Sequence, residues 1–201
     1  MGIPSQFKSV FEAKAGEERI QAWLNLDKDD AGNFKFGVRP FPPPPLSHHI
    51  SPPSKHEPAD TKNLQNWTGA LIPSTSLLST SLTPTPRATF SFTVRPEHCN
   101  RAGNLHGGAA ATLFDALTTM PLALVNDKPG YWQFLGVSRT INCSYLRPAP
   151  NGEECLVECE IVQVGRTLCQ LRGTLTRRSD GVVLATCEHH KFNTDPPASK
   201  L

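Results

Sequence analysis

The sequence has no apolar run long enough to cross a membrane, so we expect no transmembrane helix. Its net charge is only +2, whereas nucleic-acid binders carry a concentrated basic face, so we expect no nucleic-acid partner. Residues 1–6 lack the basic start and apolar core of a secretory signal. The early acids Glu12, Glu17 and Glu18 disfavour a mitochondrial presequence. These absences favour a cytoplasmic location, with a mitochondrial one as the alternative.

The cysteine pattern gives no sign of a disulfide framework or a metal site. Six cysteines are present, and without a secretory signal we expect reduced thiols. Cys155 and Cys159 share one face of an expected strand but lie about 13 Å apart along it. That separation is too large for a shared metal or a disulfide. We interpret both as small core residues and predict no metal site.

The first 86 residues differ in composition from the rest of the chain. Residues 1–37 carry scattered apolar side chains among charges, which predicts short amphipathic helices with a break at Gly16. Eleven of the 19 prolines then fall between Pro40 and Pro86. Such a stretch buries too little apolar area to fold alone, so we predict a largely irregular linker over residues 38–86. Its segment 39–45 could dock into a proline-reading module, although a plain spacer is the favoured interpretation.

A regular pattern begins at residue 87 and predicts one α+β domain over residues 87–195. Residues 89–94 alternate between polar and apolar side chains, as in a half-buried strand. A helix is expected over residues 106–124, kinked or shortened at Pro121. Four strands are then expected, at residues 133–147, 153–164, 167–177 and 182–192, with a hairpin turn at Asp180-Gly181. This order predicts an antiparallel sheet wrapped around one central helix.

The expected helix carries glycines at its start and an acid inside. Gly107 and Gly108 stand where free backbone N–H groups and the helix dipole attract negative charge. Asp115 follows in an otherwise apolar run, and a lone acid is costly to bury. A loosened turn before a core helix with a solvated acid would give the same pattern. The functional alternative is an oxyanion site at the glycines, with Asp115 as general base or nucleophile.

Helix geometry limits this functional alternative. Gly107 and Asp115 are eight residues apart, which corresponds to about 12 Å along one helix. One reacting carbonyl cannot contact both groups of the same chain. If both groups take part, one comes from a second subunit, and the site lies at a two-fold interface that is used twice. The spacing therefore predicts a homo-oligomer, provided that both groups are functional.

The combination of Asn100, Leu105-His106-Gly107-Gly108 and Asp115 resembles the hotdog-fold acyl-CoA thioesterases. Within that family it is most similar to the branch of the phenylacetate-pathway and thioesterase superfamily member 2 type. Residues 144–149 and 165–168 fit the same pattern, and the resemblance covers about residues 87–192. It implies a hotdog fold and hydrolysis of an acyl-CoA thioester to a carboxylic acid and coenzyme A. No metal or redox cofactor is implied.

The resemblance also implies four catalytic residues. Asn100 and the Gly107 N–H would bind and polarise the thioester carbonyl. Asp115 of the partner subunit would activate water or attack the carbonyl carbon, and Ser138 would help to hold the water. Without the resemblance, Asn100 would be a loop-capping side chain and Ser138 a solvated hydroxyl on a polar strand face.

Four further residues are implied in substrate binding. His106 would position its neighbours at the helix start, and Gly108 would offer a second backbone N–H. Arg166, and less directly Arg147, would contact the nucleotide phosphates of coenzyme A. Pattern alone would leave both arginines as solvated surface residues.

Several alternatives remain open at this stage. The thioester could be carried by an acyl carrier protein instead of coenzyme A, or the chain could be a non-catalytic acyl-CoA-binding module. A dehydratase of the same fold is less favoured, because paired glycines with a helix acid suit hydrolysis better. A homodimer and a dimer of dimers both satisfy the helix geometry. The acyl group is left open, and the 86 residues before the domain depart from the family pattern.

Overall fold

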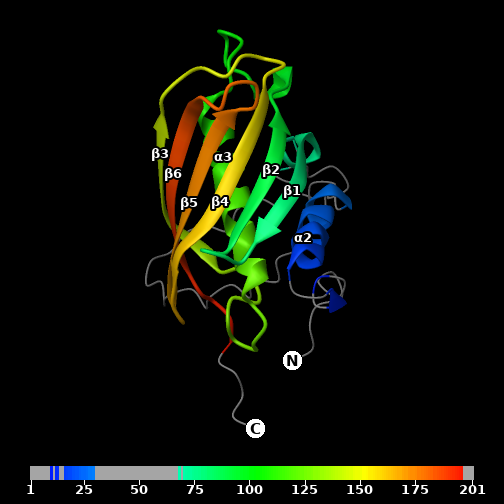
Figure 1. Cartoon of the computed structure of the whole chain (residues 1–201), viewed down its shortest axis with the longest axis vertical. Coiled ribbons are helices and arrows are strands. Elements are labelled where there is room, and N and C mark those ends of the chain that lie inside the picture. Colours follow the sequence, from blue (N-terminus) through cyan, green and yellow to red (C-terminus); the bar gives the residue numbers. More distant parts are fainter. Residues whose placement is uncertain (1–9, 11, 14–15, 30–67, 69, 197–201) are drawn as a thin grey trace, which may run out of the picture.

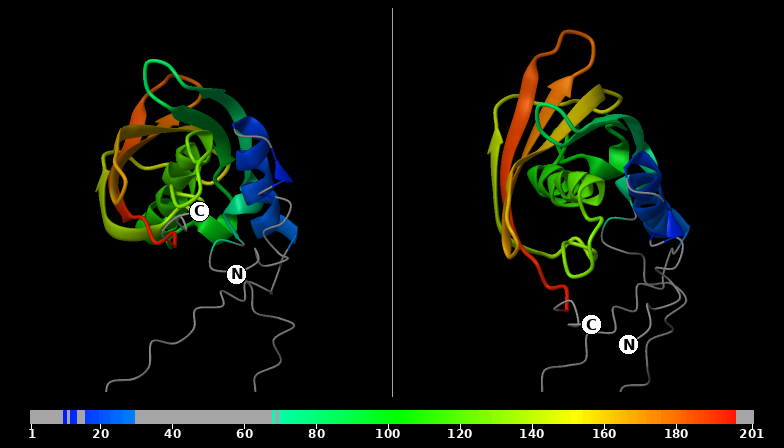
Figure 2. Two further views of the ribbon diagram at one scale, coloured as in Figure 1. Left: turned by 90° about the horizontal axis from the view of Figure 1, so that it is seen from below. Right: turned by 60° about the horizontal axis from the view of Figure 1, so that its bottom comes forward.

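The computed structural model describes residues 10, 12–13, 16–29, 68 and 70–196. One six-stranded antiparallel sheet dominates it, in the order β1-β2-β4-β5-β6-β3. The strands are β1 (Thr75–Ser81), β2 (Arg87–Thr93), β3 (Val137–Tyr145), β4 (Glu154–Val164), β5 (Leu168–Arg177) and β6 (Val183–Phe192). The sheet curves around helix α3 (Gly107–Thr119), as Figures 1 and 2 show. The predicted α+β class, with an antiparallel sheet around one helix, is confirmed.

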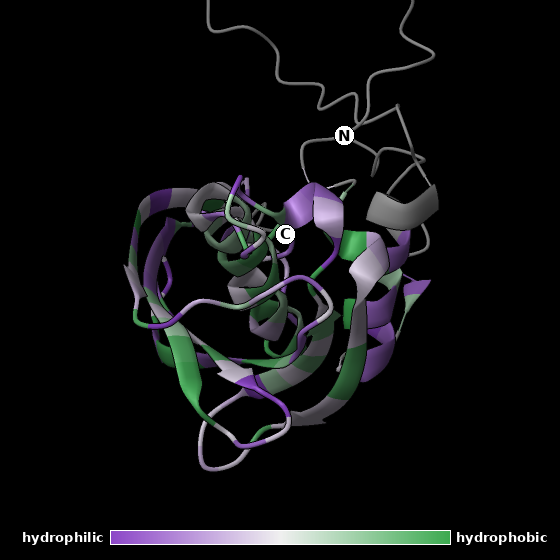
Figure 3. Ribbon diagram, turned by 90° about the horizontal axis from the view of Figure 1, so that it is seen from above, coloured by the Kyte–Doolittle hydropathy of each residue, from purple (hydrophilic) through white to green (hydrophobic). Residues whose placement is uncertain are grey.

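The core lies between the concave face of the sheet and α3. Buried and more exposed residues alternate along β2, β4 and β5, and hydropathy alternates along the strands in Figure 3. Gly173 lies near the middle of β5, where a Cβ atom would stand 2.6 Å from Cδ1 of Phe114. Glycine at this position therefore allows α3 to pack closely on the sheet.

Helix α3 ends at Thr119, close to Pro121, where the sequence predicted that the helix would be kinked or shortened. After Thr119 the chain continues as a buried 3-10 helix, η5 (Met120–Leu124), with Pro121 in its first turn. Proline has no N–H to donate, and its ring clashes with the preceding α-helical turn. The helical geometry therefore changes at Pro121, while the whole of η5 stays in the core.

The strand expected over residues 133–147 is shorter in the structure. Trp132 and Leu135 adopt positive φ angles of 58° and 59°, so the chain turns before β3 begins. β3 forms one edge of the sheet and pairs with β6. Val137 is 52% exposed and Ile141 39% exposed on this edge strand. An edge strand with exposed apolar side chains is a surface on which a second strand can pair.

The sheet begins inside the range predicted to be an irregular linker, 38–86. That prediction is wrong for residues 75–81, because β1 pairs with β2 along its length. Its position is specified by this pairing and by Leu71 and Ile72, which are buried just before it. The domain therefore starts before residue 87. Residues 38–67, including the proline tract 39–45, lie outside the described residues.

The N-terminal segment 1–37 contributes a helix to the same core. Helix α2 (Glu17–Asp29) follows Gly16, whose φ is 103°, and packs against η5, β1 and the 3-10 helix η3 (Ile72–Ser74). Ile20 and Leu24 are buried with the sheet residues. α2 is thus an integral part of the domain. No helix among the described residues is long and apolar enough to span a bilayer.

Candidate active site

His106 forms the N-cap of α3 and fixes the conformation of its first turn. Its Nδ1 accepts a hydrogen bond from the Gly108 N–H at 2.9 Å, and its own N–H donates to the His98 carbonyl at 2.8 Å. The first-turn N–H groups of a helix have no helical acceptor. His106 therefore occupies the Gly108 N–H, and the prediction that Gly108 offers a second N–H to the substrate is wrong for this conformation, which leaves Gly107 as the predicted donor of this turn.

Asn100 is a loop cap and still retains a free hydrogen-bond donor group. Its Oδ1 accepts from the N–H groups of Ala102 and Asn104, at 2.9 and 3.3 Å. Both partners are donors, so the oxygen and nitrogen of the amide are assigned without ambiguity. The Nδ2 group is then the remaining hydrogen-bonding group of this side chain. Capping and carbonyl binding are compatible, since they use opposite atoms of one amide.

Asn100 and Gly107 line the same cavity. It has a volume of about 440 Å³, and its lining also includes Tyr145 and Arg147 from β3 and the loop after it. The Tyr145 hydroxyl donates to the Gly107 carbonyl at 2.8 Å, and Arg147 donates to the Val183 carbonyl at 2.9 Å. The structure therefore brings together the two residues predicted to bind a carbonyl oxygen. It holds Arg147 beside them.

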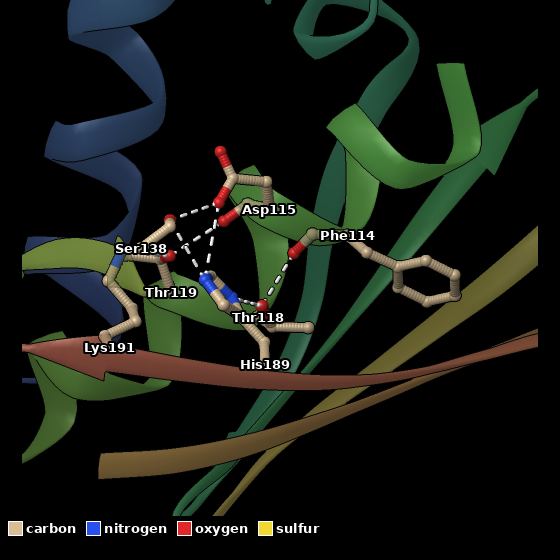
Figure 4. Close-up of polar contacts among 7 residues, drawn as sticks. All are labelled: Phe114, Asp115, Thr118, Thr119, Ser138, His189 and Lys191. Carbon is tan, nitrogen blue, oxygen red and sulfur yellow. Dashed lines mark hydrogen bonds and ion pairs between the residues drawn. The ribbon is translucent and has the colours of Figure 1, made fainter. Parts of the chain in front are cut away.

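Asp115 lies two turns further along α3 and contacts the predicted Ser138. The Ser138 hydroxyl donates to Asp115 Oδ1 at 2.5 Å (Figure 4). The Asp115 side chain is half exposed. A carboxylate held through one oxygen and open to solvent at the other can receive a proton from water.

His189 of β6 contacts both Asp115 and Ser138, and these three residues form one cluster. Its side chain is fully buried, with Nε2 3.0 Å from Ser138 Oγ and 3.4 Å from Asp115 Oδ1. Its Nδ1 lies 2.7 Å from the Thr118 hydroxyl. Burial lowers the pKa of His189 from 6.5 to about 4, and the charge of Lys191 acts in the same direction. His189 is therefore neutral near pH 7, and its contact with Asp115 is not an ion pair.

Lys191 of β6 is a second basic side chain that contacts α3. It is 4% exposed, and its Nζ donates to the Thr119 hydroxyl at 3.0 Å. The Thr119 hydroxyl in turn donates to the Asp115 carbonyl at 2.7 Å. Burial lowers the pKa of Lys191, while the charge of Asp115 opposes this shift. Figure 4 shows Lys191 and His189 approaching α3 from the same strand.

Sequence reasoning left His189 and Lys191 without a role. The predicted strand did contain the signal, because residues two apart in a strand share a face. Ala185 and Cys187 are buried, and the same alternation brings His189 and Lys191 to the inner face. Two basic side chains directed at a helix with a single acid would have indicated a polar cluster.

Arg166 lies apart from both groups, in the turn between β4 and β5. It lines a cavity of about 730 Å³ together with Lys128, Tyr131, Thr167 and Asn193. The Asn193 side chain donates to the carbonyls of Arg166 and Gly130, at 3.1 and 3.2 Å, which ties together the two loops that form the cavity. Two exposed basic side chains, Arg166 and Lys128, face this space.

The predicted catalytic residues thus form two separate pairs within one chain. Asn100 and Gly107 share one cavity, while Asp115 contacts Ser138 and His189. One continuous helix connects the two pairs, so the spacing of about 12 Å along its axis holds. In the described part of the chain, no group of three His, Cys, Asp or Glu side chains is arranged to hold a metal ion.

Comparisons with known proteins agree with this architecture. The sequence model of the thioesterase superfamily matches residues 102–184. The chain is 36% identical over 98 residues to acyl-coenzyme A thioesterase 13 of mouse, and equally to that of human. The match covers 49% of this chain and 66% of each of these relatives, just under two thirds of their length.

Solved structures give the same result in three dimensions. The crystal structure of zebrafish thioesterase superfamily member 2 is 30% identical, with a TM-score of 0.54, over 61% of this chain and 83% of that one. The mouse thioesterase superfamily member 2 structure is 34% identical, with a TM-score of 0.50, over 59% and 81%. A Streptococcus pneumoniae thioesterase-like protein crystallised with coenzyme A, 19% identical with a TM-score of 0.52 over 62% and 88%, shares the fold. The chain belongs to the thioesterase superfamily and has its hotdog fold.

Proposed function

We propose that this protein hydrolyses acyl-CoA thioesters to a carboxylic acid and free coenzyme A. The observation that carries the proposal is the 2.5 Å contact of Ser138 with Asp115, because the helix that holds Asp115 begins at Gly107, beside Asn100 in one cavity. Thioester hydrolysis needs a base for water and donors for an oxyanion, and these two pairs supply both. The names of the mouse and human relatives support acyl-CoA as the substrate class.

In the proposed reaction, Asp115 takes a proton from water as the water oxygen attacks the thioester carbonyl carbon. The carbonyl oxygen gains negative charge, which the Asn100 amide and the Gly107 N–H stabilise by hydrogen bonds. The tetrahedral intermediate then collapses, the carbon–sulfur bond breaks, and the protonated Asp115 returns its proton to the departing thiolate. Protein groups and water supply every step.

The site is completed by two copies of the chain. Because the Asn100–Gly107 pair and the Asp115–Ser138 pair are about 12 Å apart along α3, one substrate carbonyl meets only one pair from each subunit. The exposed apolar side chains of edge strand β3 offer the pairing surface for such a partner. Since β3 also carries Ser138 and Tyr145, contact between two β3 strands brings both halves of the site to the interface.

The cavity of about 730 Å³ is the proposed site for the nucleotide phosphates. Arg166 and Lys128 provide positive charge there, and guanidinium groups bind phosphate through paired hydrogen bonds. Asn193 lies four residues beyond His189 along the chain, about 13 Å for extended backbone. A phosphopantetheine arm would connect this cavity to the cluster of Asp115, Ser138 and His189.

The test is release of free thiol from a panel of acyl-CoA substrates by the purified full-length chain. We expect turnover that is lost in Asp115→Asn, which keeps the shape of the side chain but removes the base. Glu158→Gln is the matched control, because Glu158 is an exposed acid on β4. Saturable acyl-CoA binding without hydrolysis by the wild type would instead identify a binding module. Equal rates for Asp115→Asn and wild type would refute the mechanism.

A further inference from the structure

We propose that Arg19 of helix α2 is a positioning residue for the cavity of about 730 Å³: through Asn126 and Trp132 it holds the loop of residues 125–136 against the turn that carries Arg166. The role of this cavity in binding nucleotide phosphates rests on the proposed function. The contacts that hold the loop do not depend on that function, and they can be tested without substrate.

Arg19 contacts the first part of this loop directly. Its Nη1 group donates to the side-chain oxygen Oδ1 of Asn126 at 2.5 Å and lies 3.3 Å from the Asn126 carbonyl oxygen. Its Nη2 group donates to the Ala13 carbonyl at 3.1 Å, so two separate segments orient the planar guanidinium group. Val125 and Asp127 line the cavity on either side of Asn126, whereas Arg19 does not line it. Arg19 therefore acts on the cavity through Asn126.

Asn126 transmits this contact into the loop. It is 4% exposed, and its Nδ2 group donates to the Trp132 carbonyl at 3.2 Å. Because Oδ1 accepts from a guanidinium group and Nδ2 donates to a carbonyl, both ends of the amide are engaged and its orientation is assigned by its partners. An apolar residue in place of Arg19 would remove the donor of a buried oxygen, which is costly. The amide would then shift, and its contact with Trp132 would weaken.

Trp132 joins the loop to the turn between β4 and β5. Its side chain is fully buried, and its Nε1–H donates to the Gly165 carbonyl at 2.8 Å. Its φ angle of 58° is unfavourable for a residue with a Cβ atom, so surrounding contacts must hold it there. Its carbonyl accepts from both Asn126 and the Leu135 N–H, at 3.2 and 3.0 Å. Because Gly165 directly precedes Arg166, a shift at Trp132 alters the wall of the cavity that carries this basic side chain.

The end of the loop is fastened independently of α2. The N–H groups of Gln133 and Phe134 donate to the Asp195 carboxylate at 2.6 and 3.0 Å. These hydrogen bonds do not involve Arg19. We therefore expect that loss of Arg19 displaces the start of the loop while the end stays attached, so that the cavity changes shape and the domain remains folded.

The functional test compares Arg19→Met with Arg19→Lys in the full-length protein. Methionine keeps the apolar stem of the side chain but offers no donor, whereas lysine retains a charged donor for Oδ1 of Asn126. For Arg19→Met we expect KM for acyl-CoA to rise about fivefold with kcat unchanged. KM for the same acyl group on pantetheine, which lacks the nucleotide, should keep its wild-type value. Arg19→Lys should bring KM for acyl-CoA back toward the wild-type value.

Two control variants separate this role from a general contribution of α2 to stability. Ile20→Val removes one methyl group from a buried side chain of α2, so it should lower the thermal midpoint with KM for both substrates unchanged. Gln21→Met removes a hydrogen bond on the helix surface, where Gln21 donates to Asn25 at 3.0 Å, and should leave both KM values unchanged. A rise in KM for acyl-CoA in either control, or an equal rise for both substrates in Arg19→Met, would overturn the inference.

Backbone amide exchange, measured by mass spectrometry without substrate, tests the loop itself. The amides of Tyr131 and Leu135 donate to carbonyls within the loop at 3.1 and 3.0 Å, so their exchange can be accelerated. In Arg19→Met we expect faster exchange in peptides from residues 125–136, whereas peptides from β5 should exchange as in wild type. Unchanged exchange in residues 125–136 would overturn the inference whether or not the protein hydrolyses thioesters.

Asn126→Leu tests whether Arg19 acts through Asn126. If it does, the combined variant should raise KM for acyl-CoA no further than Asn126→Leu alone, whereas multiplied effects would contradict this route. If exchange in the loop increases as expected but the wild type releases no thiol from any acyl-CoA, the proposed function fails and the positioning of the loop by Arg19 stands. If the wild type is active and Arg19→Met changes neither exchange nor KM, the proposed function stands and the inference fails.

Discussion

Tyr145 of β3 donates its hydroxyl proton to the Gly107 carbonyl at 2.8 Å, so the edge strand is tied directly to the first residue of α3. A Cβ atom added at Gly107 would lie 3.3 Å from Tyr145 Cζ, which leaves little room between them. The same strand carries Ser138, which contacts Asp115 two turns further along α3. β3 and α3 therefore share both halves of the site, and any partner that pairs with β3 lies next to both.

Asn100→Asp separates the two functions of the Asn100 amide. Aspartate keeps an oxygen that accepts from the Ala102 and Asn104 N–H groups, so the loop cap and the stability should be retained. The Nδ2 donor is replaced by an acceptor, which repels an oxyanion. We expect kcat to fall at least a hundredfold with little change in the thermal midpoint, as for loss of an oxyanion-hole donor. Thiol-release kinetics and calorimetry measure both; unchanged kcat would remove Asn100 from the site.

Ile141→Lys should weaken self-association through β3. Ile141 is 39% exposed on the edge strand, and a lysine there would bring charge into the proposed interface. Val162→Lys is a matched control, because Val162 is 38% exposed on β4, away from that edge. Sedimentation should show a smaller species for the first variant alone, with loss of activity. An unchanged mass for Ile141→Lys would place the interface elsewhere.

Arg166→Gln should act on binding of the nucleotide portion of the substrate. Removing one of the two basic side chains in the cavity of about 730 Å³ should raise KM for acyl-CoA about tenfold, as for loss of a charged hydrogen bond. The same acyl group on pantetheine, which lacks the nucleotide, should show no such change. An equal effect on both substrates would mean that Arg166 does not contact the phosphates. Arg178→Gln serves as the control, because Arg178 is an exposed arginine that pairs with Glu154 at 3.7 Å.

The buried His189 makes stability depend on pH in a defined window. Its pKa is about 4 in the folded protein and about 6.5 when unfolded, so the unfolded chain binds more protons between these values. The stabilising contribution of the neutral ring is complete above pH 6.5 and is lost as pH falls toward 4. Unfolding in urea should therefore show about 2 kcal/mol less stability at pH 5 than at pH 7. His189→Gln should reduce this difference; an equal pH dependence in that variant would contradict the assignment.

The sequence predicted the parts of the fold that local patterns encode. Glycines before an apolar helix located the start of α3, and Pro121 predicted its shortening. Strand β1 was missed because it is an edge strand defined by pairing with β2, with serine and threonine at most of its positions. Tertiary pairing of this kind leaves little trace in the periodicity of the strand itself.

The sequence predicted those parts of the candidate site that lie within a single segment of the chain. Asp115 and the Gly107 N–H are properties of a single helix, and their separation follows from its rise per residue. The cluster around Asp115 combines residues of α3, β3 and β6. The sequence next to His189 does not predict that Ser138 and Thr118 are its partners. Such contacts between distant segments depend on how the sheet is ordered.

The most direct test of the account is complementation between two inactive variants. Asn100→Asp and Asp115→Asn are co-expressed with different tags, and the mixed oligomers are purified through both tags. If each site takes Asn100 from one chain and Asp115 from the other, a mixed dimer contains one intact site of two and should show about half of wild-type specific activity. If each site is built within one chain, the mixed dimer should be no more active than the two parent variants.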